Sequence, residues 1–195
     1  MKKIIAVEGN IGVGKTTLAR FLSTQFDAGL LLEEFLENKF LKLFYESNEF
    51  AFQTEMQFLL DRSLQLNNFF KNQPSLTFAD FHIDKSLIFS KINLGHDEYK
   101  IIKNTHLNLF KSYPKPDCLI FLDSGIDQII DNIKSRNRAN EKQLDKIYLE
   151  KLNENYDKWI NAQAFKIIRI PIKDINYNST ENLKKSFAQL LNISI

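Results

Sequence analysis

Residues 9–16 form a glycine-rich loop that directly follows an apolar run at residues 4–7. The loop reads GNIGVGKT and fills every fixed position of the phosphate-binding pattern G-x-x-x-x-G-K-[ST]. Because its backbone N–H groups and the following helix N-terminus favour anions, we expect a triphosphate site, with Lys15 on the outer phosphates and Thr16 on Mg²⁺. A glycine turn that binds nothing is the alternative. The expected nucleotide contacts are Gly9, Asn10, Ile11, Gly12, Val13, Gly14, Lys15, Thr16 and Thr17.

Short apolar runs recur along the chain, and each is followed by a longer stretch with helical spacing. This alternation predicts a parallel sheet with helices on both faces. Together with the loop, it indicates an α/β, P-loop NTPase-type three-layer fold with a five-stranded parallel sheet. Long helices are expected from about residue 49 to 71 and from about 145 to 163. The expected strands are residues 3–7, 29–32, 76–79, 117–122 and 165–170.

The chain has 195 residues and no linker-like stretch, so we expect a single domain over residues 1–195. A net charge of +2 argues against nucleic acid as a partner. Apolar runs stay short of the roughly 18 residues that a membrane span needs. The first strand begins near the N-terminus and leaves no room for a signal peptide. We therefore expect a cytoplasmic protein with no membrane partner.

Acidic residues follow three of the expected strands, where open parallel sheets bind ligands. Glu33 would lie beside the γ-phosphate, where a carboxylate can orient and deprotonate a hydroxyl. A solvated acid at a strand end is the alternative for this residue. Asp80 stands where an acid can hold Mg²⁺ through water, and Asp123 is a competing candidate.

Glu55 and Arg62 are seven residues apart and therefore share one face of the long helix expected at 49–71. Opposite charges among apolar neighbours are suited to binding a flat heteroaromatic ring. The alternative is an ion pair at the rim of the core. Farther along, Arg136 and Arg138 lie in the polar segment 134–141. This segment is a candidate lid over the phosphates, or a favourable cluster of charge at a helix C-terminus.

These segments resemble the deoxynucleoside kinase family over nearly the whole chain. The resemblance rests on the loop at 9–16, EEFLEN at 33–38 with FYE at 44–46, the helix at 50–62, RNR at 136–138 with Glu141, and DINY at 174–177. It implies an enzyme of nucleotide salvage that transfers the γ-phosphoryl group of ATP to the 5′-hydroxyl of a deoxynucleoside. It also implies a homodimer.

The resemblance assigns roles to matching residues. Glu33 is implied as the general base, and Tyr45 with Glu141 as contacts of the sugar 3′-hydroxyl. Arg136 and Arg138 are implied to hold the donor phosphates from a lid at about 134–144. The two residues implied to lie against the donor adenine are Asp174 and Asn176.

Two departures from the family pattern bear on the acceptor. Glu55 stands where most members have glutamine, and an ionised carboxylate only accepts hydrogen bonds. With Arg62 as a donor, this favours purines, deoxyadenosine ahead of deoxyguanosine, without excluding cytosine. Phe81 replaces the arginine that usually follows the metal-binding acid, and Lys85 is a candidate to supply the missing positive charge.

Two alternative functions remain open at this point. A nucleoside monophosphate kinase needs extra arginines near Asp80, where this chain has Phe81. A non-kinase P-loop ATPase or nucleotide switch would use Asp123 as its metal acid and would leave Glu55 and Tyr45 with structural roles.

Overall fold

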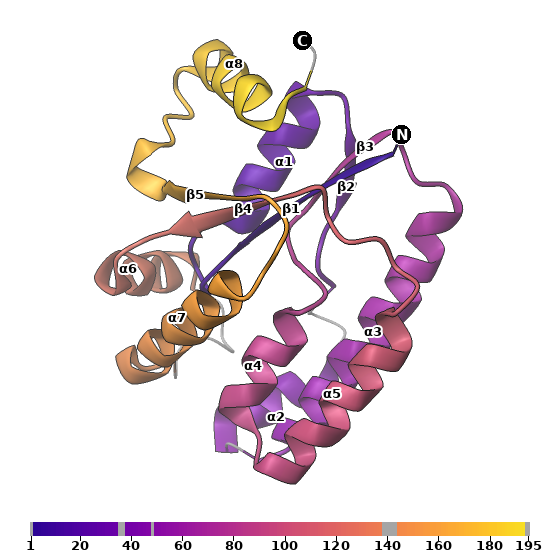
Figure 1. The fold of residues 1–195 in the computed structure, drawn as a ribbon. Coiled ribbons are helices and arrows are strands. Elements are labelled where there is room, and N and C mark those ends of the chain that lie inside the picture. The colour runs from indigo at the N-terminus through magenta and orange to yellow at the C-terminus, as the bar shows by residue number, and fades with distance from the viewer. Residues whose placement is uncertain (1, 35–37, 48, 138–143, 194–195) are drawn as a thin grey trace.

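The computed structural model describes residues 2–34, 38–47, 49–137 and 144–193 (Figure 1). Its centre is a five-stranded sheet in the order β2-β3-β1-β4-β5, and every pair of neighbouring strands is parallel. All five expected strands are confirmed, although the last begins and ends slightly later than the apolar run suggested. The strands are β1 (Lys3–Gly9), β2 (Gly29–Leu31), β3 (Leu76–Ala79), β4 (Cys118–Asp123) and β5 (Ile167–Pro171).

Helices connect the strands, and both expected long helices are present. The helical elements are α1 (Lys15–Gln25), α2 (Lys39–Ser47), α3 (Ala51–Lys71), α4 (Lys85–Asn93), α5 (His96–Phe110), α6 (Ile126–Arg136), α7 (Lys146–Asn161), the 3₁₀ turn η2 (Ile172–Asp174) and α8 (Thr180–Leu191). Within the described residues, none of these helices has both the length and the apolar character needed to cross a membrane.

The sheet is covered on both faces, as the alternating pattern predicted. Successive strand residues point to opposite faces, so Ile5 and Val7 pack with α1 and α8 on one side. Ala6 points the other way and packs with α4 and α7. Leu31 and Ala79 extend that second face toward α3 and α5. The result is the three-layer α/β fold that was expected (Figure 1).

The order of the strands positions the site. β1 pairs with β3 on one side and with β4 on the other, because the chain runs from β1 out to β2, returns to β3 and then crosses β1 to reach β4. Such a switch point opens a crevice at the carboxyl ends of the strands. The loop after Gly9 enters this crevice between Asp80, which follows β3, and Asp123, which ends β4.

Candidate active site

The glycine-rich loop has the backbone geometry that its sequence predicts. Gly9 has φ +149°, and a Cβ atom there would lie 2.6 Å from the carbonyl oxygen of Leu122 on β4. Gly14 caps α1 with φ +100°. Only glycine adopts such angles without strain, so these positions keep the loop tight against the sheet.

Lys15 folds its side chain back over the loop. Its ammonium group donates to the carbonyl oxygens of Gly9 at 3.0 Å and Asn10 at 2.9 Å. Burial, together with the nearby ammonium group of Lys85, lowers the pKa of Lys15 to about 8. Within the described part of the chain, both hydrogen bonds of this ammonium group go to backbone carbonyls and neither to a carboxylate, so it is placed to meet a phosphate.

Asn10 is an anchor of the loop. Its side-chain amide donates to the carbonyl oxygen of Leu149 at 2.9 Å and to Asn153 at 2.6 Å, both on α7. Its amide oxygen accepts the backbone N–H of Ile11 at 2.8 Å. The Asn10 side chain therefore holds the loop to α7. The nucleotide contact expected of Asn10 would come from its backbone.

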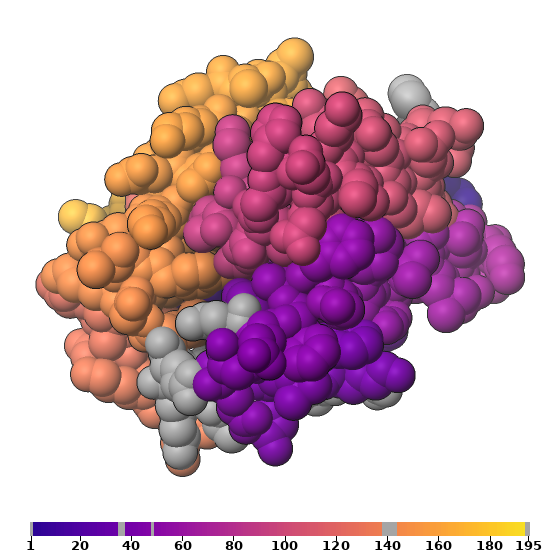
Figure 2. Space-filling view, turned by 90° about the horizontal axis from the view of Figure 1, so that it is seen from below, coloured from indigo at the N-terminus to yellow at the C-terminus, as the bar shows by residue number. Residues whose placement is uncertain are grey.

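A cavity of about 370 Å³ extends from the loop into the space between α2, α3, α4 and α7. Figure 2 shows the face of the molecule at which α2 and α7, which both border the cavity, reach the surface. From the glycine-rich loop, Ile11, Gly12, Lys15 and Thr16 line the cavity. The other predicted residues that line it are Glu33, Tyr45, Glu55, Arg62, Asp80, Lys85 and Arg136.

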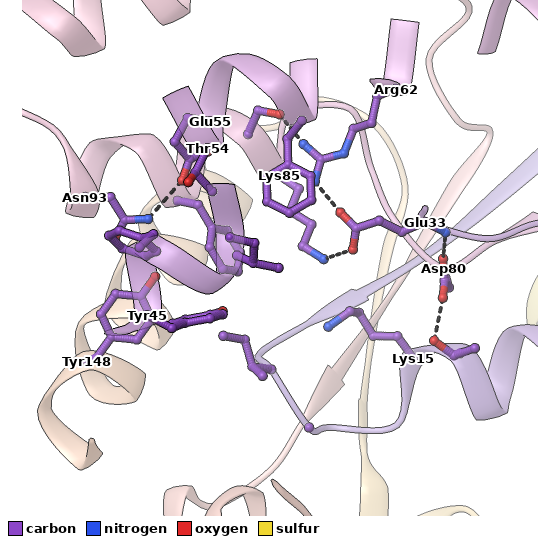
Figure 3. A pocket seen from close by; sticks show the side chains of 18 of the residues that line it. Lys15, Glu33, Tyr45, Thr54, Glu55, Arg62, Asp80, Lys85, Asn93 and Tyr148 are labelled. Atoms are coloured by element: carbon purple, nitrogen blue, oxygen red, sulfur yellow. Dashed lines mark hydrogen bonds and ion pairs between the residues drawn. The ribbon is translucent and has the colours of Figure 1, made fainter. Parts of the chain in front are cut away.

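Glu33 lies between two cations at the end of the cavity nearest Lys15 (Figure 3). One of its carboxylate oxygens accepts from the guanidinium group of Arg62, and the other accepts from the ammonium group of Lys85. Burial opposes ionisation of Glu33, but these two cations outweigh it and hold its pKa well below the usual range. The carboxylate is therefore ionised at neutral pH.

Arg62 has different partners from those that the helix spacing suggested. Its guanidinium group donates to Glu33 and to the hydroxyl of Ser86, and it lies 5.1 Å from the ring centroid of Phe58. Within the described part of the chain, Arg62 makes no direct hydrogen bond or ion pair with Glu55. The two residues face one cavity, but Arg62 supports the carboxylate of Glu33.

Asp80 connects the loop to the end of β2. One carboxylate oxygen accepts the hydroxyl of Thr16, and the other accepts the backbone N–H of Glu33 at 2.7 Å. A hydroxyl and a carboxylate side by side are hard oxygen ligands that suit Mg²⁺, which takes few protein ligands and completes its shell with phosphates and water. Asp123 points to Arg169 instead, at 4.0 Å.

Glu55 lies at the other end of the cavity, on α3. Its side chain is 3% exposed, and its two oxygens accept from Ser90 at 3.1 Å and Asn93 at 2.9 Å, both on α4. Burial raises the pKa of Glu55 to about 7, although Asn93 and Arg62 oppose the rise. Glu33 and Glu55 are therefore two carboxylates of one cavity with opposite electrostatic environments.

The sequence reasoning missed three residues at this end of the cavity. Ser90 and Asn93 bind Glu55, and Tyr148 on α7 lines the cavity. Burial raises the pKa of Tyr148 above its usual value. Ser90 follows Ser86 by four residues and Asn93 follows by three more, so α4 periodicity was an available signal. Tyr148 carried no comparable signal, because its helix is far away in the sequence.

Glu8, which precedes the loop on β1, is a further residue that the sequence reasoning missed. It is fully buried and accepts the backbone N–H of His82 at 2.6 Å and the hydroxyl of Tyr156 at 2.8 Å. Burial raises its pKa. Glu8 thus joins β1, just before the loop, to the segment between β3 and α4; Lys85 is the first residue of α4.

The remaining predicted residues lie apart from the cavity or outside the described residues. Arg138 and Glu141 fall in the undescribed segment 138–143, which also holds most of the predicted lid. Asp174 ends η2, and the side chain of Asn176 accepts the backbone N–H of Asn178 at 3.0 Å. Neither Asp174 nor Asn176 is among the described residues that line the cavity.

Comparison with known proteins identifies relatives over most of the chain. A "Deoxyguanosine kinase" of Bacillus subtilis is 35% identical over 157 residues, which cover 78% of this chain and 76% of the relative. A "Deoxyadenosine/deoxycytidine kinase" of the same organism is 30% identical over 208 residues, covering 96% of this chain and 93% of the relative. Both relatives phosphorylate deoxynucleosides according to their names, and the named bases differ.

Solved structures show the same fold. The deoxyadenosine kinase of M. mycoides with bound dATP superposes with a TM-score of 0.82 at 23% identity, covering 97% of this chain and 99% of the other. The same enzyme with bound dCTP gives a TM-score of 0.81 at 21% identity, covering 97% and 100%. The family model for deoxynucleoside kinase matches residues 5–194. With a matching model over almost its whole length and a cavity that joins a phosphate-binding loop to a carboxylate, this chain belongs to the deoxynucleoside kinase family.

Proposed function

We propose that this kinase transfers the γ-phosphoryl group of ATP to the 5′-hydroxyl of a purine deoxynucleoside, with deoxyadenosine preferred to deoxyguanosine. The observation that carries the proposal is the placement of two carboxylates in one cavity. Glu33 lies at the end next to the phosphate-binding loop, and Glu55 lies at the opposite end (Figure 3). A nucleoside between them would direct its hydroxyl to Glu33 and its base to Glu55.

The reacting hydroxyl would be held by Glu33. Because Arg62 and Lys85 depress its pKa, Glu33 is a weak proton acceptor, and its main contribution is to orient the hydroxyl toward the phosphorus. Phosphoryl transfer passes through a loose transition state, so orientation matters more than early removal of the proton. Lys85 would place positive charge beside the 5′-oxygen, in the role that Phe81 cannot fill.

The donor would be held by the glycine-rich loop. Lys15 would exchange its bonds with loop carbonyls for the phosphates, and Arg136 at the end of α6 would add a second positive charge. Thr16 and Asp80 would hold Mg²⁺, which neutralises charge on the phosphates when it is bound. We extend this donor site to Arg138 in the predicted lid and to Asp174 and Asn176 on the adenine side.

The base would be read by Glu55 with its neighbours from α4. A carboxyl group among neutral donors can take the exocyclic amine of adenine or the N1 and N2 hydrogens of guanine. Tyr45 and Glu141 would fix the sugar, and Tyr45 would crowd a 2′-hydroxyl group. The two Bacillus subtilis relatives are named for different bases, so membership of the family does not fix the base.

A homodimer would account for apolar side chains that face outward on adjoining helices. Leu60 and Leu64 on α3 are 50% and 64% exposed, and Ile101 and Leu107 on α5 are 50% and 55% exposed. The two helices pack side by side, so these residues are available to a second copy of the chain. Light scattering of the wild type and of Leu64→Glu tests this: the variant should be monomeric if the face is the interface.

The direct test measures ATP-dependent and Mg²⁺-dependent phosphorylation of the four deoxynucleosides, beside adenosine and the four deoxynucleoside monophosphates. We expect deoxyadenosine to be phosphorylated with the highest kcat/KM and adenosine with a much lower value. Turnover of the monophosphates alone would instead establish a nucleoside monophosphate kinase.

A variant separates the kinase from a nucleotide switch. Replacing Glu55 with alanine should abolish deoxynucleoside binding and leave ATP binding intact, because Glu55 lies at the end of the cavity away from Lys15. Isothermal titration with a non-hydrolysable ATP analogue, and then with deoxyadenosine, measures both. If Glu55→Ala changes neither affinity, the cavity is not an acceptor site.

A further inference from the structure

The surroundings of Glu55 differ from those of Glu33, the other glutamate among the described residues that line the cavity. Its oxygens accept from a hydroxyl, that of Ser90, and from an amide, that of Asn93. Both donors are neutral, whereas Glu33 is bound by two cations. Each oxygen of Glu55 has a further lone pair, and its side chain lines the cavity. The group is thus held in place without being locked into its ionised form.

A carboxyl group in that position presents two different patterns of hydrogen bonding. The protonated form has one donor and one acceptor, which match the N1 and the N6 amine of adenine. The ionised form has acceptors only, which match the N1 and N2 hydrogens of guanine. Against adenine, the ionised form keeps one of these two bonds and sets a negative charge opposite the N1 lone pair.

We propose that Glu55 reads the purine in two protonation states, so that the preference between deoxyadenosine and deoxyguanosine depends on pH. This inference rests on the proposed function, because it requires the base to occupy the Glu55 end of the cavity. Low pH favours deoxyadenosine, and high pH favours deoxyguanosine.

The charged and titratable groups around Glu55 come from each element that packs against the cavity. Arg62 of α3 and Lys85 of α4 lie beyond it and are bound to Glu33, which follows β2. Tyr45 of α2 and Tyr148 of α7 face the cavity near Glu55. Lys15 and Arg136 line its phosphate end.

Among these groups, Glu55 titrates near neutral pH at the base end of the cavity, whereas Lys15, with a pKa of about 8, lies at the phosphate end. The pKa of Glu55 is about 7, because burial outweighs the hydrogen bonds and the attraction of Arg62. The pKa of Tyr148 is raised, away from this interval, and that of Glu33 is depressed below it. Between about pH 6 and about pH 8.5, adenine N1 stays unprotonated and guanine N1 keeps most of its proton. With a pKa of about 7, the protonated fraction of Glu55 falls from about nine-tenths to a few per cent across that interval.

The experiment is a competition between the two purine deoxynucleosides. Equal, low concentrations of deoxyadenosine and deoxyguanosine are phosphorylated together at a series of pH values, and the ratio of dGMP to dAMP is measured. This ratio reports the two kcat/KM values relative to each other, so effects of pH on Glu33, on Lys15 or on the donor cancel. We expect the ratio to rise about tenfold or more from about pH 6 to about pH 8.5. A ratio that stays constant overturns the inference.

A matched variant assigns the effect to Glu55. Glu55→Gln carries a donor and an acceptor at every pH, so its ratio should not change with pH. Tyr148→Phe removes a neighbouring titratable group and should keep the pH dependence of the wild type. If Tyr148→Phe abolishes the dependence, or Glu55→Gln retains it, the inference is overturned.

A modified substrate gives an independent test that needs no variant. The 1-deaza analogue of deoxyadenosine keeps the exocyclic amine but has a C–H group in place of N1, so protonated Glu55 gains no bond to it. In competition with deoxyguanosine, its phosphorylation should depend on pH less than that of deoxyadenosine, and an equal dependence overturns the inference. Failure of the proposed function is distinguishable, because then neither deoxynucleoside is phosphorylated at any pH.

Discussion

The guanidinium group of Arg62, in the middle of α3, donates to a carboxylate oxygen of Glu33, just beyond the end of β2. The side chain of Arg62 is 4% exposed and that of Glu33 is 12% exposed, so the pair is largely screened from water. Removing one partner of such a pair leaves the other charge buried and unpaired. The interaction therefore holds the proposed catalytic carboxylate in one place and in one charge state.

Glu33→Gln should lower kcat by about 100-fold or more, because the neutral amide loses its ion pairs with Arg62 and Lys85 and both orients and deprotonates the hydroxyl less well. In the wild type, Arg62 and Lys85 depress the pKa of Glu33, so kcat should not fall through protonation of this residue until pH is well below the ordinary range for glutamate. Steady-state kinetics against pH measure both. Glu34→Gln, at an exposed neighbour, is the control, and equal losses in the two variants would remove Glu33 from the catalytic machinery.

Lys85→Met should lower kcat/KM for the deoxynucleoside by about 100-fold, a loss typical of removing one group that stabilises transition-state charge. Lys85→Arg should retain most of the activity, because it keeps a cation beside Glu33. Lys91→Met removes an exposed lysine from the same helix and serves as the control. If Lys85→Met is no worse than Lys91→Met, the charge missing at Phe81 is not replaced by Lys85.

Asp80→Asn should raise the Mg²⁺ concentration needed for half-maximal activity by about tenfold, because the neutral amide holds the metal and the Thr16 hydroxyl less well. Asp123→Asn should leave that concentration unchanged, since Asp123 faces Arg169. Activity titrated with Mg²⁺ at saturating ATP distinguishes the two acids. The opposite result would make Asp123 the metal acid, as the nucleotide-switch alternative requires.

Glu55 should make the stability of the protein depend on pH. Burial raises its pKa from 4.5 to about 7 in the folded state, so ionising it in the folded protein costs free energy. Its contribution is complete below about pH 4.5 and is lost as pH rises to about 7, by about 3 kcal/mol at about 1.4 kcal/mol per pKa unit.

Urea unfolding of the wild type and of Glu55→Gln at several pH values measures this contribution. As pH rises from about 4.5 to about 7, the unfolding free energy of the wild type should fall relative to that of the variant. The difference between the two should be constant above about pH 8. Glu46→Gln, at an exposed position on α2, is the control. A difference in unfolding free energy that does not vary with pH would mean that the surroundings of Glu55 do not shift its pKa.

Much of the scaffold could be predicted from local pattern. The five strands follow from short apolar runs, and the glycine-rich loop follows from eight consecutive residues whose spacing encodes strand, turn and helix. The positions of Glu33 and Asp80 near the loop followed as well, because parallel strands end at one edge of a sheet. These features depend on neighbours in the sequence or on a rule that all parallel sheets obey.

The partners within the cavity could not be predicted in the same way. Helical spacing correctly put Glu55 and Arg62 on one face of α3, but it does not say what lies opposite that face. In the folded chain, β2 brings Glu33 to Arg62, while α4 brings Ser90 and Asn93 to Glu55. Periodicity along a helix sets the direction of a side chain, whereas its partners and its pKa depend on which distant segments the sheet order brings against it.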